Sequence, residues 1–132
     1  MRLYSAFLLL LCSCVSTREL VVRDAGVSSN AYAVTISDQQ ATMDVLYRLE
    51  QQQIVDGPGD RTAKTLAVDR VRVAWARPMA LLELAAAVHR RLAGQVVLGD
   101  AGAVQLDLDE LRDLTRWIGA AIAEARTRIV RR

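Results

Sequence analysis

Few side chains in this sequence can act as nucleophiles or hold a transition metal. The chain has 132 residues but only two cysteines and one histidine, and both cysteines, Cys12 and Cys14, lie near its start. A zinc or iron site needs several such ligands, and a disulfide between cysteines two positions apart is strained. His89 has no partner that would make it a general base, and we interpret it as a cation suited to a helix end. We therefore expect no catalytic residue, no metal and no cofactor, and a protein that is not an enzyme.

Aromatic residues and net charge are also in short supply. Aromatics make up 5% of the chain against 52% hydrophobic residues overall, and the formal net charge is +2. A core of alanine, leucine and valine favours helices, and so weak a net charge gives no support to nucleic-acid binding. The length allows a single domain.

The first residues have the pattern of a secretory signal. Arg2 supplies a positive charge, an apolar run covers residues 3–11, and small or polar residues follow. A permanent membrane-spanning helix needs roughly 20 apolar residues, so we expect this segment to be processed. Leu11-Cys12-Ser13-Cys14 resembles the lipobox of bacterial lipoproteins, in which a leucine stands three positions before a cysteine that becomes lipidated and N-terminal.

The resemblance implies a signal peptide over residues 1–13 and a lipid anchor on Cys14. The position two before the modified cysteine is usually a small residue such as alanine or serine, and here it is Cys12. Two acyl chains anchor a protein stably in a membrane. Because Val15 rather than aspartate follows Cys14, the family rule places the protein in the outer membrane, facing the periplasm. The alternative is ordinary signal cleavage after Ser16, which would make the mature protein begin at Thr17.

Residues 14–30 are polar and mixed, and we interpret them as the lipidated N-terminus and a tether to a domain spanning residues 31–132. The alternation of Tyr32, Val34 and Ile36 predicts a short strand. Ser37 and Gln40 then form a capping box, which predicts a helix start. Asp56-Gly57-Pro58-Gly59-Asp60 ends that helix, because glycine and proline in succession cannot continue it.

The segment from Arg61 to Ala93 has a wide apolar helical stripe, but its first half is ambiguous. The stretch RVRVAWAR alternates as a strand would, and Pro78 disfavours helical geometry at Arg77. Residues 61–77 therefore fit a helix or a strand. We favour helix on both sides of a break or kink at Arg77 and Pro78, ending at Gly94.

The last third of the chain predicts a turn and then a long helix. Two short Val/Leu runs flank Gly99-Asp100-Ala101-Gly102, a pattern typical of a β-hairpin. Asp107 to Glu110 has the form of a capping box, which accounts for these acids without a cation. From there to about Arg131, apolar residues follow one helix face: Leu108, Leu111, Leu114, Ile118, Ala121, Ile122, Ala125 and Ile129.

Two features are candidates for contacts with a partner. Trp75 and Trp117 lie on apolar or semi-apolar helix faces, where core packing is the commoner role, yet tryptophan is also enriched at binding hot spots. We take Trp117 as a candidate contact. The second feature is the arginine cluster at the C-terminus, which suits either anionic lipid headgroups or an acidic partner: Arg126, Arg128, Arg131 and Arg132.

Together these patterns predict a mainly α fold of the α+β kind, with about three to four helices and one or two short strands or a β-hairpin. The expected function is that of a small lipid-anchored envelope protein that binds a protein partner as an accessory or adaptor of an envelope assembly. Pilotins resemble it in kind and size. The alternatives are an exclusion or lysis lipoprotein encoded by a phage or plasmid, or a soluble periplasmic protein or enzyme with an unrecognised site.

Overall fold

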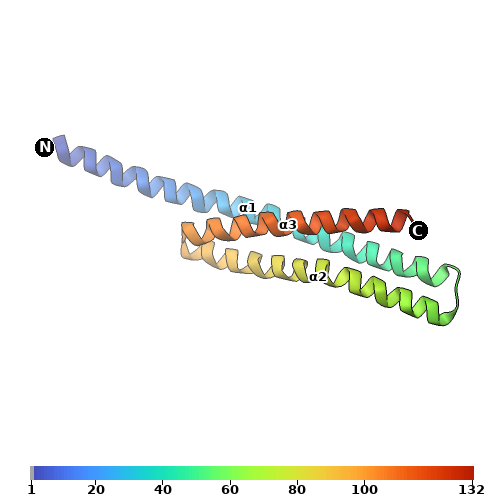
Figure 1. The fold of residues 1–132 in the computed structure, drawn as a ribbon. Coiled ribbons are helices and arrows are strands. Elements are labelled where there is room, and N and C mark those ends of the chain that lie inside the picture. The colour runs from blue at the N-terminus through green and yellow to red at the C-terminus, as the bar shows by residue number, and fades with distance from the viewer. Residues whose placement is uncertain (1) are drawn as a thin grey trace.

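Three long helices pack side by side in an up-down-up arrangement (Figure 1). In this computed structural model they are α1 (Arg2–Asp56), α2 (Arg61–Leu98) and α3 (Ala101–Val130). The structure describes the backbone from residue 2 and the side chains from residue 23. The mainly α prediction is thereby confirmed, and each pair of helices is in contact.

The core follows a seven-residue repeat along each helix. On α1 the buried residues Ser29, Ile36, Met43 and Glu50 stand seven positions apart, which is the spacing that keeps one face of a helix turned toward its neighbours. The facing helices supply apolar side chains mostly at three- and four-residue spacing. The buried apolar residues of α2 and α3 are Val71, Trp75, Leu82, Ala85, Val88, Leu92, Val104, Leu111, Leu114, Ile118, Ile122, Ala125 and Ile129.

Short connections with strong capping residues join the helices. The predicted stop at residues 56–60 is confirmed, since α1 ends at Asp56 and Asp60 caps α2 by accepting a 2.7 Å hydrogen bond from the Ala63 amide. Between α2 and α3, Gly99 adopts a left-handed φ of 70° and Asp100 accepts from the Ala103 amide at 3.1 Å. Glycine takes this conformation without steric cost, so the chain reverses in two residues.

The predicted β-hairpin around residue 100 is wrong. Helix α2 passes through Gly94 to Leu98, and α3 begins at Ala101 rather than Asp107. The same Gly-Asp pair that would suit a strand turn serves here as the C-cap of one helix and the N-cap of the next. Asp107 is not a capping residue; it is buried on the inner face of α3, one turn after the buried Val104.

The predicted strand at residues 32–36 is also wrong, because these residues belong to α1. Tyr32 and Ile36 are four positions apart and turn to the same inner face, while Val34 is 61% exposed. Three apolar residues at alternate positions are too few to distinguish a strand from a helix, and here the chain is helical.

Residues 61–77 are helical, and α2 continues through Pro78 as one helix instead of two. Proline cannot give an amide hydrogen to the carbonyl four positions earlier, which here belongs to Ala74. The predicted break is therefore not seen, and the burial of Val71, Trp75 and Leu82 on both sides of the proline stabilises the helix across it.

The beginning of the chain is described only in part. Residues 23–30, the last part of the predicted tether, are helical, and Ala25 and Ser29 are buried. The packed region thus includes residues before the expected boundary at 31. The predicted signal peptide over residues 1–13 and the lipidation site Cys14 lie outside the residues whose side chains are described. Within the described part of the chain, none of the helices combines the length and apolarity needed to cross a membrane.

Candidate partner-binding groove

A groove of about 510 Å³ runs between α2 and α3 on the surface of the bundle. Trp75, which is buried, lies at its base, and Trp117, which is 56% exposed, stands at its side. The residues that line it are Ala74, Trp75, Arg77, Pro78, Leu81, Trp117, Ala120, Ala121, Glu124, Ala125 and Arg128. Two of the predicted contact residues, Trp117 and Arg128, are therefore brought to one site.

Small residues and a proline create the groove. Ala74 on α2 and Ala120 and Ala121 on α3 fill little of the space between the helices. Pro78 also lines the groove and leaves the Ala74 carbonyl without its usual helical hydrogen bond. The groove thus combines an exposed indole with apolar walls.

A buried glutamate holds the base of the groove in place. Glu50 of α1 is fully buried and accepts a 2.7 Å hydrogen bond from Trp75 Nε1. Arg128 of α3 donates to both carboxylate oxygens of Glu50, from Nε at 2.7 Å and from a terminal nitrogen at 3.0 Å. Arg132 lies 3.1 Å from Oε1. This cluster ties the three helices together at one level of the bundle.

The electrostatics of the cluster keep Glu50 ionised. Burial raises the pKa of Glu50, but hydrogen bonds from Arg128 and Trp75 and the charges of Arg128 and Arg132 outweigh burial, so the pKa lies below its ordinary value. The hydrogen bonds to Glu50 raise the pKa of Arg128 in turn. The guanidinium of Arg128 also lies 5.9 Å from the centre of the Trp75 ring. The ring of Tyr47 contacts the Trp75 ring in an edge-on arrangement.

The C-terminal arginines divide into two pairs with different surroundings. Arg128 and Arg132 are engaged with Glu50, so their first role is structural. Arg126 and Arg131 are exposed and available for contact with another molecule. Sequence reasoning missed Glu50, although its place seven residues after Met43 and fourteen after Ile36, on an otherwise apolar stripe, is a signal that could have found it.

The other polar groups singled out in the sequence have partners within the bundle. His89 Nε2 lies 3.1 Å from Ser29 Oγ and 3.0 Å from the Ser29 carbonyl, which joins α2 to α1. Arg91 pairs with Asp107 and Glu110, each at 2.7 Å, and these contacts raise the pKa of Arg91. These residues hold helices together.

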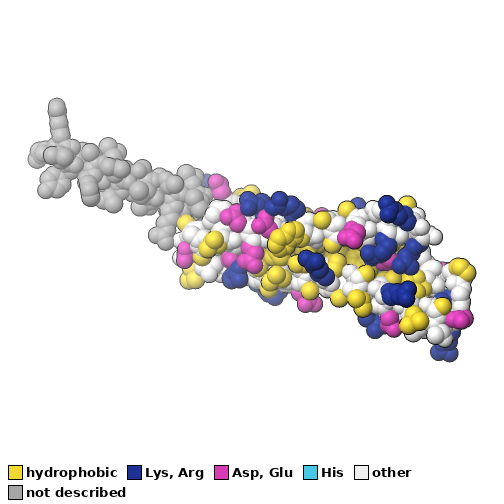
Figure 2. All heavy atoms as spheres, viewed as in Figure 1, with side chains coloured by type: hydrophobic (Ala, Val, Ile, Leu, Met, Phe, Trp, Pro, Cys, Tyr) yellow, Lys and Arg dark blue, Asp and Glu magenta, His cyan; other side chains and the backbone are white. Residues whose placement is uncertain are grey.

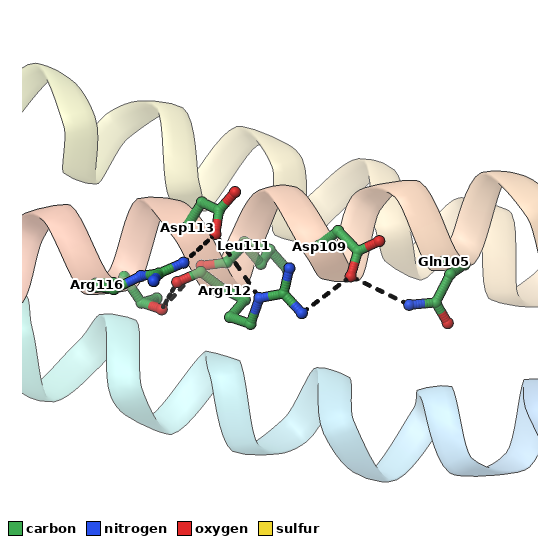
Figure 3. Close-up of polar contacts among 7 residues, drawn as sticks. Gln105, Asp109, Leu111, Arg112, Asp113 and Arg116 are labelled. Atoms are coloured by element: carbon green, nitrogen blue, oxygen red, sulfur yellow. Dashed lines mark hydrogen bonds and ion pairs between the residues drawn. The ribbon is translucent and has the colours of Figure 1, made fainter.

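The acids and arginines on the outer face of α3 pair with each other at short spacing (Figure 3). Asp109 lies 3.4 Å from Arg112 and accepts a hydrogen bond from Gln105, while Asp113 pairs with Arg116. Asp107 and Glu110 both pair with Arg91, whereas Asp109 turns to Arg112 and Gln105, so the three acids do not turn toward one common point.

No family model, curated protein or solved structure matches this chain. The site must therefore be interpreted from its own chemistry.

Charge is distributed unevenly along the bundle. Residues 48–77 and 124–132, at the end where α1 connects to α2, contain ten Lys and Arg against five Asp and Glu. Residues 23–47 and 78–123, toward the other end, contain five Lys and Arg against nine Asp and Glu. Figure 2 shows the Lys and Arg side chains gathered over the α1–α2 end. The groove lies toward this basic end, and Arg77 lines it.

Proposed function

We propose that this protein is a small lipid-anchored protein of the cell envelope that acts by binding, as an accessory or adaptor component of an envelope assembly, and that an acidic segment of a protein partner occupies the groove. The observation that carries the binding role is the exposure of Trp117 beside the groove. An exposed tryptophan next to an apolar hollow is a common centre of binding energy.

Charge supports an acidic partner. Within the groove Arg77 and Glu124 form no ion pair with a described residue, whereas Arg128 is already paired with Glu50, so the positive excess comes from the surrounding end of the bundle. The surrounding end of the bundle carries a twofold excess of cations over acids. A positive potential of this kind attracts acidic segments and raises the rate at which they associate.

The direction of the helices supports a protein partner over the headgroups of the anchoring membrane. Helix α1 enters the bundle at the α2–α3 connection, and α3 ends at the opposite end (Figure 1). The 34 residues from Arg23 to Asp56 correspond to roughly 50 Å at 1.5 Å per residue. In an upright molecule anchored through Cys14, Arg126 and Arg131 lie far from the bilayer that holds the anchor.

The anchor is tested by metabolic labelling with palmitate. We expect the wild type and Cys12→Ser to be labelled and Cys14→Ser to remain unlabelled, because the small Ser13 directly precedes Cys14, whereas the bulky Leu11 directly precedes Cys12. A mature N-terminus at Thr17 would show that an ordinary signal peptidase processes the chain instead.

The groove is tested by placing a photo-crosslinking amino acid at position 117 in living cells. We expect one discrete adduct, lost when Arg77→Glu reverses the charge of the groove. The matched control is the same amino acid at position 106, since Leu106 is 71% exposed on α3 but does not line the groove. An equal adduct from position 106, or an adduct indifferent to Arg77→Glu, would rule out this groove as the binding site.

A further inference from the structure

Helix α1 carries a second apolar stripe on the face that points away from the bundle. Val27, Val34 and Val45 are 70%, 61% and 64% exposed. Ala31 and Ala41, also exposed, fall between them. The intervals along the stripe alternate between four and three residues, as in a helix that packs along another helix. None of the groove residues comes from α1, so this face is independent of the proposed function.

Two side chains of opposite charge occupy positions where the four- and three-residue spacing of the stripe would place an apolar residue. Asp38 lies between Val34 and Ala41, and Arg48 follows Val45. Both side chains are exposed, and neither forms an ion pair with any residue whose side chain the structure describes. They lie ten positions apart on one helix, about 15 Å, and so cannot reach one another within a single chain.

We propose that a second copy of this chain covers the stripe, with the two α1 helices antiparallel. Because the Cys14 positions of the pair then lie at opposite ends, the copies cannot both stand upright on one bilayer, so this dimer and the upright orientation argued above are alternative states of the chain. Around a twofold axis at the level of Met43, Asp38 of each copy faces Arg48 of the other. The same register places Ala41 opposite Val45 and Ala31 opposite Val55. A twofold interface makes each of these contacts twice. Both charges are then paired, Ala41 and Ala31 face valines so that the helices can approach closely, and Val34 faces Gln52.

The charges also select the direction of packing. In a parallel pair with the helices in register, Asp38 would face Asp38 and Arg48 would face Arg48. Like charges placed opposite each other in an interface are strongly unfavourable, whereas the antiparallel register turns both repulsions into attractions. A single stripe therefore specifies both the partner and its orientation.

A zero-length cross-link tests the register directly. The chain contains one lysine, Lys64, so Arg48→Lys introduces an amine at an otherwise amine-free face. Carbodiimide treatment of the purified full chain in mild detergent should join position 48 of one copy to Asp38 of the other, giving a dimer on a denaturing gel and a 38–48 peptide by mass spectrometry. The wild type should not give this peptide. Its absence from the Arg48→Lys protein would overturn the proposal.

Charge reversal tests the energetics. Asp38→Arg and Arg48→Asp should each weaken dimerisation by about tenfold or more in light scattering at varied concentration, and the double variant Asp38→Arg/Arg48→Asp should restore it. The matched control is Asp44→Arg, an exposed acid on α1 that lies off the stripe. At concentrations low enough for the wild type to be monomeric, all four variants should melt as the wild type does, because the changed side chains are exposed. A monomeric wild type, or a single reversal that leaves the dimer intact, would refute the proposal.

Discussion

Glu50 is a charged side chain at a position where its helix otherwise buries apolar ones. A buried carboxylate is costly unless donors surround it, and here Trp75, Arg128 and Arg132 supply them. The arrangement makes the stability of the bundle depend on residues close to the end of the chain. Removing a donor leaves the charge buried and underpaired.

Arg128→Ala should therefore destabilise the fold by roughly 3 kcal/mol, toward the lower end of the range for breaking a buried ion pair, because Arg132 still reaches Glu50. Chemical denaturation measures this difference. Arg126→Ala is the matched control: it removes the same side chain from an exposed position two residues earlier and should change stability little. Equal losses from both variants would show that the Glu50 pair contributes nothing specific.

The pH dependence of stability follows from the lowered pKa of Glu50. A carboxylate whose folded pKa lies below its unfolded value stabilises the fold above the unfolded pKa, here about 4.5, and that contribution is lost as the pH falls through the folded pKa. We expect the free energy of unfolding to decrease as the pH drops below about 4.5. Glu50→Gln should be less stable than the wild type at neutral pH, and its free energy of unfolding should depend less on pH in acid. Unfolding curves between neutral and acid pH measure both slopes. Parallel slopes would mean that other carboxylates cause the acid sensitivity.

At the scale of the helix, sequence periodicity predicted the buried face of α3 but placed the start of this helix at Asp107 instead of Ala101. The apolar stripe from Leu108 to Ile129 is buried as expected, except that Leu108 and Ala121 are only partly covered. Both Asp100 and Asp107 have the chemistry of an N-cap. Helix α3 starts after Asp100 because Val104 is buried in the core and Asp107 forms an ion pair with Arg91 of α2. These contacts come from another helix, so no local pattern reveals them.

The predicted strands failed for a related reason. Alternation over five residues is compatible with one face of a helix, and a strand also needs a partner strand to satisfy its backbone. Instead, Ile36 belongs to the apolar core of the bundle and Tyr32 packs against that core. Likewise, the buried neighbours of Pro78 hold α2 as one helix where the local sequence indicated a break.

Pro78 lowers the stability of α2, and its replacement should show this. Pro78→Ala restores an amide that can bond to the Ala74 carbonyl, so we expect the protein to become more stable by up to about 3 kcal/mol, with a higher melting temperature. Pro58→Ala is the control, because Pro58 lies in the exposed connection between α1 and α2. If the added stability also weakens the adduct at position 117, the proline is retained for the groove. A lower melting temperature for Pro78→Ala would contradict the expected gain.

At the scale of the molecule, the candidate site was predictable only in part. Trp117 and the C-terminal arginines were identified from residue type, and Trp117 does stand beside a groove. The sequence does not reveal that Arg128 and Arg132 are committed to Glu50, because 78 residues separate Glu50 from Arg128. Nor does it reveal the groove, which depends on which alanines of α2 and α3 the packing places side by side.

The uneven placement of charge along the bundle affects the orientation in which the molecule approaches a charged surface. A rod with excess cations toward one end and excess acids toward the other has a permanent electric dipole along its axis. Near an acidic surface, that dipole exerts a torque that turns the basic end forward before any side chain touches. The torque acts over a distance set by ionic screening, about 8 Å in physiological salt and longer in dilute buffer. We therefore expect the bundle to approach any acidic surface with its basic end forward.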